Sequence, residues 1–462
     1  MANLVFSDGL NPAVDKTDTF NPAYCFLNSS NYSYVQAKTS GLNANLIHII
    51  DYFKPRDFGL SNDQYARFEG VEPPIKRIGE PSNNGFINLI QYKRGGYVTY
   101  AVLKSSTRPN ADNLMYEYMV GQYVNKLNKR FPCFVETYGY YKYKNKQIWE
   151  DFKVNKDEYE VSALKLGLEL QDKIDYAVAC ENSDQLAILI QYLPNITAIY
   201  WKLLNEDFLQ KELANVLFQI YMPLSVLAGS FTHHDLHAGN VNVCEPAEDS
   251  YIQFHYHMDD GTELLFKSKY IAKMIDYGRS YFNDEEAGID STKIYKEICA
   301  EPKCKPDCGE GKGFFNSQNR LIDVRLLEDV RKVTLENHKH EYLPEQLKFL
   351  LRNLDYDEWL KTSRIDVRVA ALALKNIISD PVVIASNDAE YVGKKKLGNL
   401  HIYCTGPDLK GMQFMEEDGM SFDNRESREQ SFERQKLEDI IPPVPKKRKK
   451  PSQEGWTFLF GF

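Results

Sequence analysis

Hydrophobic spacing near residue 90 predicts two strands followed by a helix. Apolar and β-branched residues dominate 86–92 and 97–104, and the Lys-Arg-Gly-Gly segment at 93–96 is typical of the turn of a β-hairpin. Residues 110–129 then carry apolar side chains at helical spacing, with Asp112 as the expected cap. The pattern predicts a hairpin that leads directly into a helix.

The second half of the pattern is mainly helical. Residues 185–194 form an apolar run that ends in a proline, which predicts a buried strand. An apolar helix interrupted by Pro223 is expected over 208–230, and alternation around Asp-Asp-Gly predicts an inserted hairpin over 251–266. Further helices are expected at 319–327, 344–354 and 364–378. We therefore predict an α+β fold.

Composition narrows the classes of protein that fit. The chain has 462 residues and a formal net charge of −9, which disfavours a general nucleic-acid-binding surface. No apolar run approaches the ~18 residues of a membrane span, and the first residues lack the pattern of a signal peptide. The 8 cysteines are irregularly spaced, which favours reduced thiols in a cytoplasmic or nuclear protein.

Two groups of possible metal ligands have a plainer interpretation. Cys299, Cys304 and Cys308 match no common zinc spacing, so loop thiols are expected there. His255 and His257 share one strand face and are expected to be solvated.

The two ends of the chain differ from its middle. Residues 1–74 are polar with weak periodicity and are predicted to form an extension of unknown role. Residues 416–450 are highly charged, and their composition predicts disorder. The basic tract at 446–450 predicts nuclear import, with a solvated tail as the alternative. The aromatic segment 456–462 could dock onto the domain or onto a partner.

The residues that best indicate chemistry lie in two segments. The first is Phe-Thr-His-His-Asp-Leu-His-Ala-Gly-Asn-Val, which places Asn240 five residues after Asp235. The second is Lys-Met-Ile-Asp-Tyr-Gly-Arg-Ser, which contains Asp276. Phosphoryl transfer from ATP needs a carboxylate beside the acceptor hydroxyl and oxygen ligands for Mg²⁺. Asp235 fits the first role, and Asn240 with Asp276 fits the second.

These segments resemble the catalytic and metal-binding motifs of the protein-kinase-like family, H-R-D-L-x-x-x-N and D-F-G. His233, Asp235 and Asn240 are in register with the first motif, and Tyr277 replaces the phenylalanine of the second. A literal Asp-Phe-Gly at 57–59 lies far upstream of the catalytic loop, so it cannot be the metal-binding motif.

The resemblance implies a two-lobed fold. It predicts a small β-rich lobe over 75–194 and a larger, mainly helical lobe over 195–380, with an inserted hairpin at 246–270. Residues 381–462 would form a C-terminal extension. Asp323 is the expected carboxylate that braces the catalytic loop.

The resemblance also assigns roles in an ATP site. Ala-Val-Leu-Lys resembles the V-A-I-K strand, so Lys104 would hold the phosphates and Glu117 on the next helix would hold Lys104. The turn around 79–85 would cover the triphosphate, although it departs from G-x-G-x-x-G. Backbone groups from Gln191 to Leu193 would face the adenine base. The candidate phosphate-binding residues in the turn are Gly79, Ser82 and Gly85.

A narrower likeness concerns the substrate. The combined motifs resemble those of serine/threonine protein kinases encoded by large nucleocytoplasmic DNA viruses, which implies a protein substrate. Asp-Leu-His also occurs in small-molecule kinases that act on aminoglycosides or choline, and these are the rival enzymes. His234 and His237 replace the usual Arg and Lys, and no Ala-Pro-Glu motif follows. Together with the incomplete glycine loop, the missing motif keeps a pseudokinase scaffold as the non-enzymatic alternative. The sequence does not indicate an oligomeric state.

Overall fold

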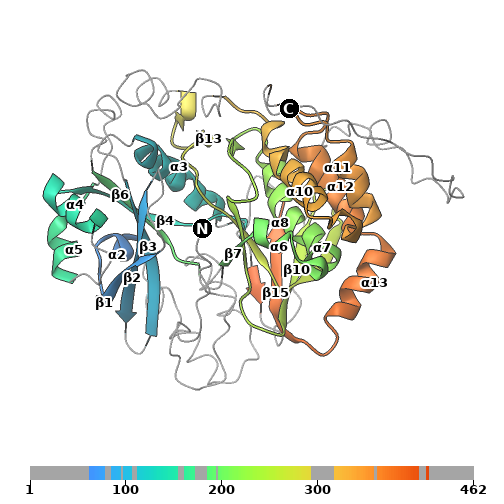
Figure 1. The fold of residues 1–462 in the computed structure, drawn as a ribbon, viewed down its shortest axis with the longest axis horizontal. Coiled ribbons are helices and arrows are strands. Elements are labelled where there is room, and N and C mark those ends of the chain that lie inside the picture. Colours follow the sequence, from blue (N-terminus) through green and yellow to red (C-terminus); the bar gives the residue numbers. More distant parts are fainter. Residues whose placement is uncertain are drawn as a thin grey trace, which may run out of the picture. The chain divides into compact units, whose positions relative to one another are not determined.

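A computed structural model describes residues 62–78, 85–94, 97–106, 112–128, 130–154, 161–171, 185–193, 196–292, 317–357, 360, 362–404 and 413–415. Their fold is mixed α and β, as predicted, and it contains several separate sheets (Figure 1). The predictions for residues 1–61, for the Cys299 to Cys308 cluster and for residues 416–462 lie outside the described residues.

The largest sheet has six antiparallel strands in the order β1-β2-β3-β6-β4-β5. The predicted hairpin is confirmed as β2 and β3, and the predicted strand before Pro194 is confirmed as β6. The strands are β1 (Val71–Ile78), β2 (Phe86–Arg94), β3 (Tyr97–Ser105), β4 (Thr137–Tyr143), β5 (Leu168–Leu170) and β6 (Leu186–Gln191).

One face of this sheet is covered by short helices. The helices α2 (Asn62–Ala66), α4 (Lys146–Val154) and α5 (Val161–Gly167) contact its strands (Figure 1). Trp149 and Phe152 of α4 join the buried cluster of this sheet. The chain between β4 and β6 is therefore partly helical, because Trp149 and Phe152 pack into the core of this sheet.

Helix α3 (Asp112–Asn128) contacts β4 and β6 of the same sheet. It confirms the predicted helix over 110–129. Its buried residues Tyr116, Val120 and Val124 recur at helical spacing. The helix therefore has one orientation relative to the sheet, and this orientation fixes the direction in which Glu117 points.

The described chain from residue 196 onward contains both helices and strands. The helices are α6 (Ile199–Lys202), α7 (Glu206–Lys211), α8 (Leu213–Val226), η5 (Ile322–Val324), α10 (Arg325–Glu336), η6 (His340–Tyr342), α11 (Glu345–Arg352), α12 (Val367–Ile378) and α13 (Pro381–Glu390). The helices predicted over 344–354 and 364–378 are confirmed as α11 and α12. In the described part of the chain, no single helix is long and apolar enough to cross a membrane, and α12 with α13 pass such a test only as a pair bent by 69°.

The helix predicted over 208–230 is broken at a different point than expected. It is divided at Glu212, between α7 and α8, and Pro223 lies inside α8. Because α8 is buried on nearly all sides and packs against α12, tertiary contacts outweigh the cost of the proline.

Two three-stranded sheets hold the segments that carry the motifs. One has the order β12-β9-β7, and the other has the order β14-β13-β8. Their strands are β7 (Ile196–Ala198), β8 (Phe231–Thr232), β9 (Val241–Cys244), β12 (Ile271–Met274), β13 (Tyr281–Asp284) and β14 (Ile289–Asp290).

The inserted hairpin is confirmed as β10 (Ser250–His257) and β11 (Glu263–Ser268). Strand β15 (Lys395–Tyr403) pairs in parallel with β10, and β16 (Gln413–Met415) pairs with β15. The extension predicted from residue 381 onward therefore begins with ordered elements, which complete the sheet of the hairpin.

Candidate functional site

Pairing of β9 with β12 brings the two motifs together. Val241 pairs with Met274, and the backbone N–H of Ile275 donates to the carbonyl of Asn240 over 3.0 Å. The hairpin β10–β11 is inserted at the end of this pair where Cys244 pairs with Ile271. Its length therefore does not change the pairing at the other end, next to Asn240 and Asp276. Asn240 and Asp276 consequently lie at neighbouring positions although 36 residues separate them in the sequence.

Lys104 links the six-stranded sheet to the second motif. Its Nζ lies 2.6 Å from Oε2 of Glu117 on α3 and 3.2 Å from Oδ1 of Asp276. The side chains of Lys104 and Glu117 are only 16% and 8% exposed, whereas that of Asp276 is 40% exposed. The structure thus brings three predicted site residues into contact, and one of the two carboxylates remains accessible to a ligand.

The charges of this group depend on one another. Burial alone would lower the pKa of Lys104, but Asp276 and Glu117 outweigh it and raise the pKa above its usual value. Burial raises the pKa of Glu117 to about 7, and Lys104 opposes this shift. Lys104 lowers the pKa of Asp276 below its usual range. At neutral pH the site therefore presents a cationic lysine and an anionic Asp276 side by side.

Two arginines hold Asp235, and sequence reasoning did not single out either of them. Arg325 Nη1 lies 3.0 Å from Asp235 Oδ1, and Arg279 Nη1 lies 3.9 Å from Oδ2. The amide nitrogen of Asn240 donates to the carbonyl of Asp235 over 3.0 Å. Arg279 directly follows the Asp-Tyr-Gly motif, so only its position in the sequence could have indicated a role.

Two carboxylates, the buried Asp323 and the half-buried Asp329, brace the loop that carries Asp235. The two oxygens of Asp323 accept the backbone N–H groups of His233 and His234 at 2.7 and 2.9 Å. Asp329 accepts the N–H of Ala238 at 2.8 Å. The predicted bracing role of Asp323 agrees with these contacts, whereas Asp329 was not anticipated.

Two residues of the motifs have a left-handed backbone that L-residues rarely adopt. His234 has φ of 62° and Asp276 has φ of 69°. Such conformations are costly and cluster at functional sites, where surrounding contacts maintain them. Here Asp323 holds the backbone of His234, and Lys104 holds the side chain of Asp276.

Tyr277, which replaces the family's phenylalanine, is buried with its hydroxyl paired. The hydroxyl donates to the carbonyl of Met274 at 2.7 Å and accepts the N–H of Val135 at 3.0 Å. His233 packs against the tyrosine ring, and its Nε2 lies 3.1 Å from the carbonyl of Ile275. The two motifs therefore share one packed core, which fixes Asp276 relative to Asp235.

The predicted nucleotide-binding residues lie partly inside and partly outside the described part of the chain. Gly79 and Ser82 lie outside the described residues. Gly85 closely approaches the strand that carries Lys104, because a Cβ there would lie 2.8 Å from the carbonyl oxygen of Ser105. The backbone N–H of Gln191 donates to the carbonyl of Glu136 at 2.8 Å, so only its other groups could face a base. Leu193 is buried just beyond β6.

Removing the brace should destabilise the protein. Replacing Asp323 with Ala leaves two buried N–H groups without their acceptor. Because each such loss costs about 1–3 kcal/mol, the free energy of unfolding should fall by about 2–5 kcal/mol. Asp323→Asn keeps one acceptor oxygen and should lose less. Chemical denaturation measures the free energy of unfolding of both variants. Glu336→Gln, on the exposed surface of α10, is the control. An Asp323→Ala variant as stable as the wild type would contradict the bracing role.

Comparison with known proteins finds no family model that matches this chain and no match among curated proteins.

Proposed function

We propose that this chain is an ATP-dependent phosphotransferase with a two-lobed protein-kinase-like fold, acting on serine or threonine hydroxyls of a protein. The observation that carries the proposal is the contact of Lys104 with both Glu117 and Asp276, the latter 172 residues away. A strand lysine, a helix glutamate and a motif aspartate form the set that kinases use to hold ATP phosphates.

The arrangement of helices and strands supports the proposed two-lobed fold. The antiparallel sheet with α3 would form the small lobe, and the elements from β7 onward, dominated by helices, would form the large lobe. Lys104 and Glu117 come from the first group, and Asp235, Asn240 and Asp276 come from the second. ATP would then bind where the two groups meet.

The donor atoms present fit a magnesium ion bound with ATP. Asp276 offers a carboxylate that is partly exposed, and the amide of Asn240 uses its nitrogen for Asp235, which leaves the oxygen as its ligand atom. Oxygen ligands of this kind suit Mg²⁺. Mg·ATP, when bound, supplies the transferable phosphoryl group, and the ion offsets the negative charge of the phosphates. Lys104 would add a positive charge to the same phosphates.

Asp235 would receive or orient the proton of the acceptor hydroxyl. Its side chain is 20% exposed, so a substrate can reach it, while Arg325 fixes one of its oxygens. Asn240 holds its backbone, and the Asp323 brace holds the residues just before it. Positioning and charge stabilisation supply most of the acceleration in phosphoryl transfer, and these contacts restrict Asp235 to one orientation.

The experiment that tests the proposal offers purified full-length protein labelled ATP and Mg²⁺, with protein substrates and small alcohols in parallel reactions. Label in protein, on serine or threonine, is the expected result. Label in a small product would support the aminoglycoside- or choline-type alternative, for which Asp-Leu-His is the sequence feature. Nucleotide binding without transfer would support the scaffold, and the absence of binding would overturn the proposal.

A further inference from the structure

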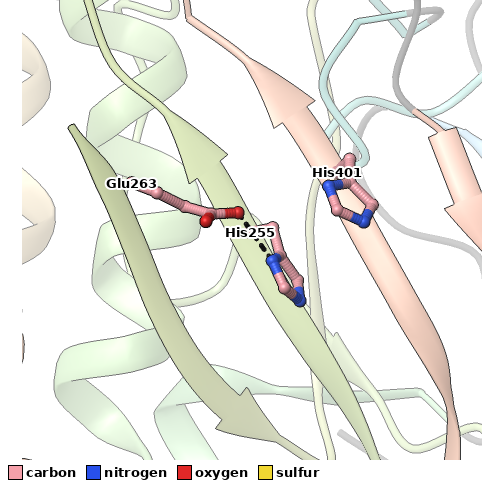
Figure 2. A group of neighbouring side chains, drawn as sticks. All are labelled: His255, Glu263 and His401. Carbon is pink, nitrogen blue, oxygen red and sulfur yellow. Dashed lines mark hydrogen bonds and ion pairs between the residues drawn. The ribbon is translucent and has the colours of Figure 1, made fainter. Parts of the chain in front are cut away.

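Three potential metal ligands lie close together on the sheet of the inserted hairpin. They are His255 on β10, Glu263 on β11 and His401 on β15 (Figure 2). One ligand atom from each lies within 4.8 Å of the other two. His255 Nδ1 lies 2.7 Å from Oε1 of Glu263.

A fourth potential ligand adjoins this group. His257 Nε2 lies 2.9 Å from Nδ1 of His401 and 3.8 Å from Oε1 of Glu263. Tetrahedral zinc with bonds of about 2.0–2.1 Å separates neighbouring ligand atoms by about 3.3 Å. The separations of 2.7, 2.9 and 3.8 Å lie on both sides of that value, and the ligand atoms of His255, Glu263 and His401 lie within 4.8 Å of one another, so metal binding would require the side chains to rotate.

The sheet fixes these side chains in place. His255 is directly opposite His401 in the parallel pair β10–β15, and His257 is opposite Glu263 in the antiparallel pair β10–β11. On the other face of β10, Ile252, Phe254 and Tyr256 are buried in the core. Because alternate residues of a strand point to opposite faces, both histidines lie on the other face of the sheet, together with Glu263 and His401.

The expectation that His255 and His257 are solvated is therefore wrong for His255, whose side chain is 14% exposed. Its two ring nitrogens face two oxygens, because Nε2 lies 3.1 Å from Oδ1 of Asn399. A neutral imidazole has only one N–H. If Nε2 donates to Asn399, then Nδ1 presents a lone pair toward the carboxylate, an arrangement that a bound cation would stabilise.

The surroundings of His401 also favour its neutral form. Burial, with smaller contributions from the neighbouring His255, His257 and Lys396, lowers the pKa of His401 to about 3. Metal binding requires the unprotonated ring, so His401 is ready to bind at neutral pH. Glu263 is 38% exposed and leaves a path for an ion to enter.

We propose that His255, Glu263 and His401 bind a divalent transition-metal ion of the zinc type, with His257 as the fourth ligand. Nitrogen and carboxylate ligands suit zinc. The ion would connect the hairpin to β15, which lies more than 130 residues further along the chain. The site would therefore stabilise the sheet rather than take part in phosphoryl transfer.

The test is titration of chelator-treated full-length protein with Zn²⁺ against a competing metal indicator. We expect wild-type protein to bind one equivalent of Zn²⁺. The variants His401→Asn and Glu263→Gln should each lose this binding or bind Zn²⁺ on the order of 10–100-fold more weakly. His338→Asn is the matched control, because it removes an exposed histidine outside this group. Unchanged zinc binding in both site variants, or no binding by the wild type, would overturn the proposal.

Two further measurements distinguish this site from zinc binding by cysteines and from a metal-free ion pair. Co²⁺ absorption should show nitrogen and oxygen ligands without thiolate bands, whereas binding by the cysteines would give such bands. Zinc should raise the melting temperature of the wild type and of His338→Asn, but not that of Glu263→Gln. If His255 and Glu263 instead form an imidazolium–carboxylate pair, zinc will not change the melting temperature, and the proposal fails. None of these measurements depends on kinase activity.

Discussion

Replacing Asp235 with Asn should slow phosphoryl transfer by about 10²–10⁴-fold and leave Mg·ATP affinity near that of the wild type. Asp235 lies beside Arg325 and Arg279 and makes no contact with Lys104 in the structure. Because its proposed role concerns the acceptor hydroxyl, the substitution should lower the rate of phosphoryl transfer and not the affinity for Mg·ATP. Single-turnover transfer and nucleotide affinity, measured on the same preparation, separate the two effects.

The variant also loses an ion pair with Arg325, which makes a stability control necessary. The melting temperature of Asp235→Asn should be compared with that of the wild type, and rates should be measured well below both. Near-normal turnover in a folded Asp235→Asn variant would show that the catalytic assignment is wrong, and the scaffold would then become the better interpretation.

Replacing Asp276 with Asn should weaken Mg·ATP binding and also slow transfer, again by about 10²–10⁴-fold. The change removes one of the two carboxylates that hold Lys104, as well as the proposed metal ligand. Nucleotide affinity measured with and without Mg²⁺ should show that the variant loses mainly the magnesium-dependent part.

Asp284→Asn is a matched control for this prediction. Asp284 also pairs with a lysine, Lys126 of α3, but it belongs to β13 and has no proposed contact with ATP. It should leave magnesium-dependent affinity unchanged. Equal losses in Asp284→Asn and Asp276→Asn would indicate a general effect on packing, and equal affinity of Asp276→Asn and the wild type would exclude Asp276 as a metal ligand.

Local patterns predicted much of the fold. The hairpin of β2 and β3 and the helix α3 follow from alternation, turn residues and helical spacing, all of which act within about 20 residues. The contact between Lys104 and Glu117 could be anticipated from the resemblance, which expects a glutamate on the helix after the lysine strand. The position of Asp323 could be anticipated only from the resemblance.

The remaining features depend on contacts between distant segments. The parallel pairing of β10 with β15 has no local signal, so neither the role of residues 395–403 nor the position of His401 beside His255 could be predicted. Arg325 reaches Asp235 only because α10 packs against the loop that carries Asp235. Pro223 was expected to break its helix, but burial of α8 on nearly all sides outweighs that local preference.

The proposed phosphotransfer site can be tested by locating nucleotide and metal on the full-length protein. Crystals grown with Mn²⁺ and a non-hydrolysable ATP analogue would reveal the metal by its anomalous scattering. We predict a manganese ion bound by Asp276 and Asn240, with analogue phosphates contacting Lys104 and the terminal phosphate facing Asp235. An analogue bound elsewhere, or a metal that contacts neither Asp276 nor Asn240, would contradict the proposed phosphotransfer site.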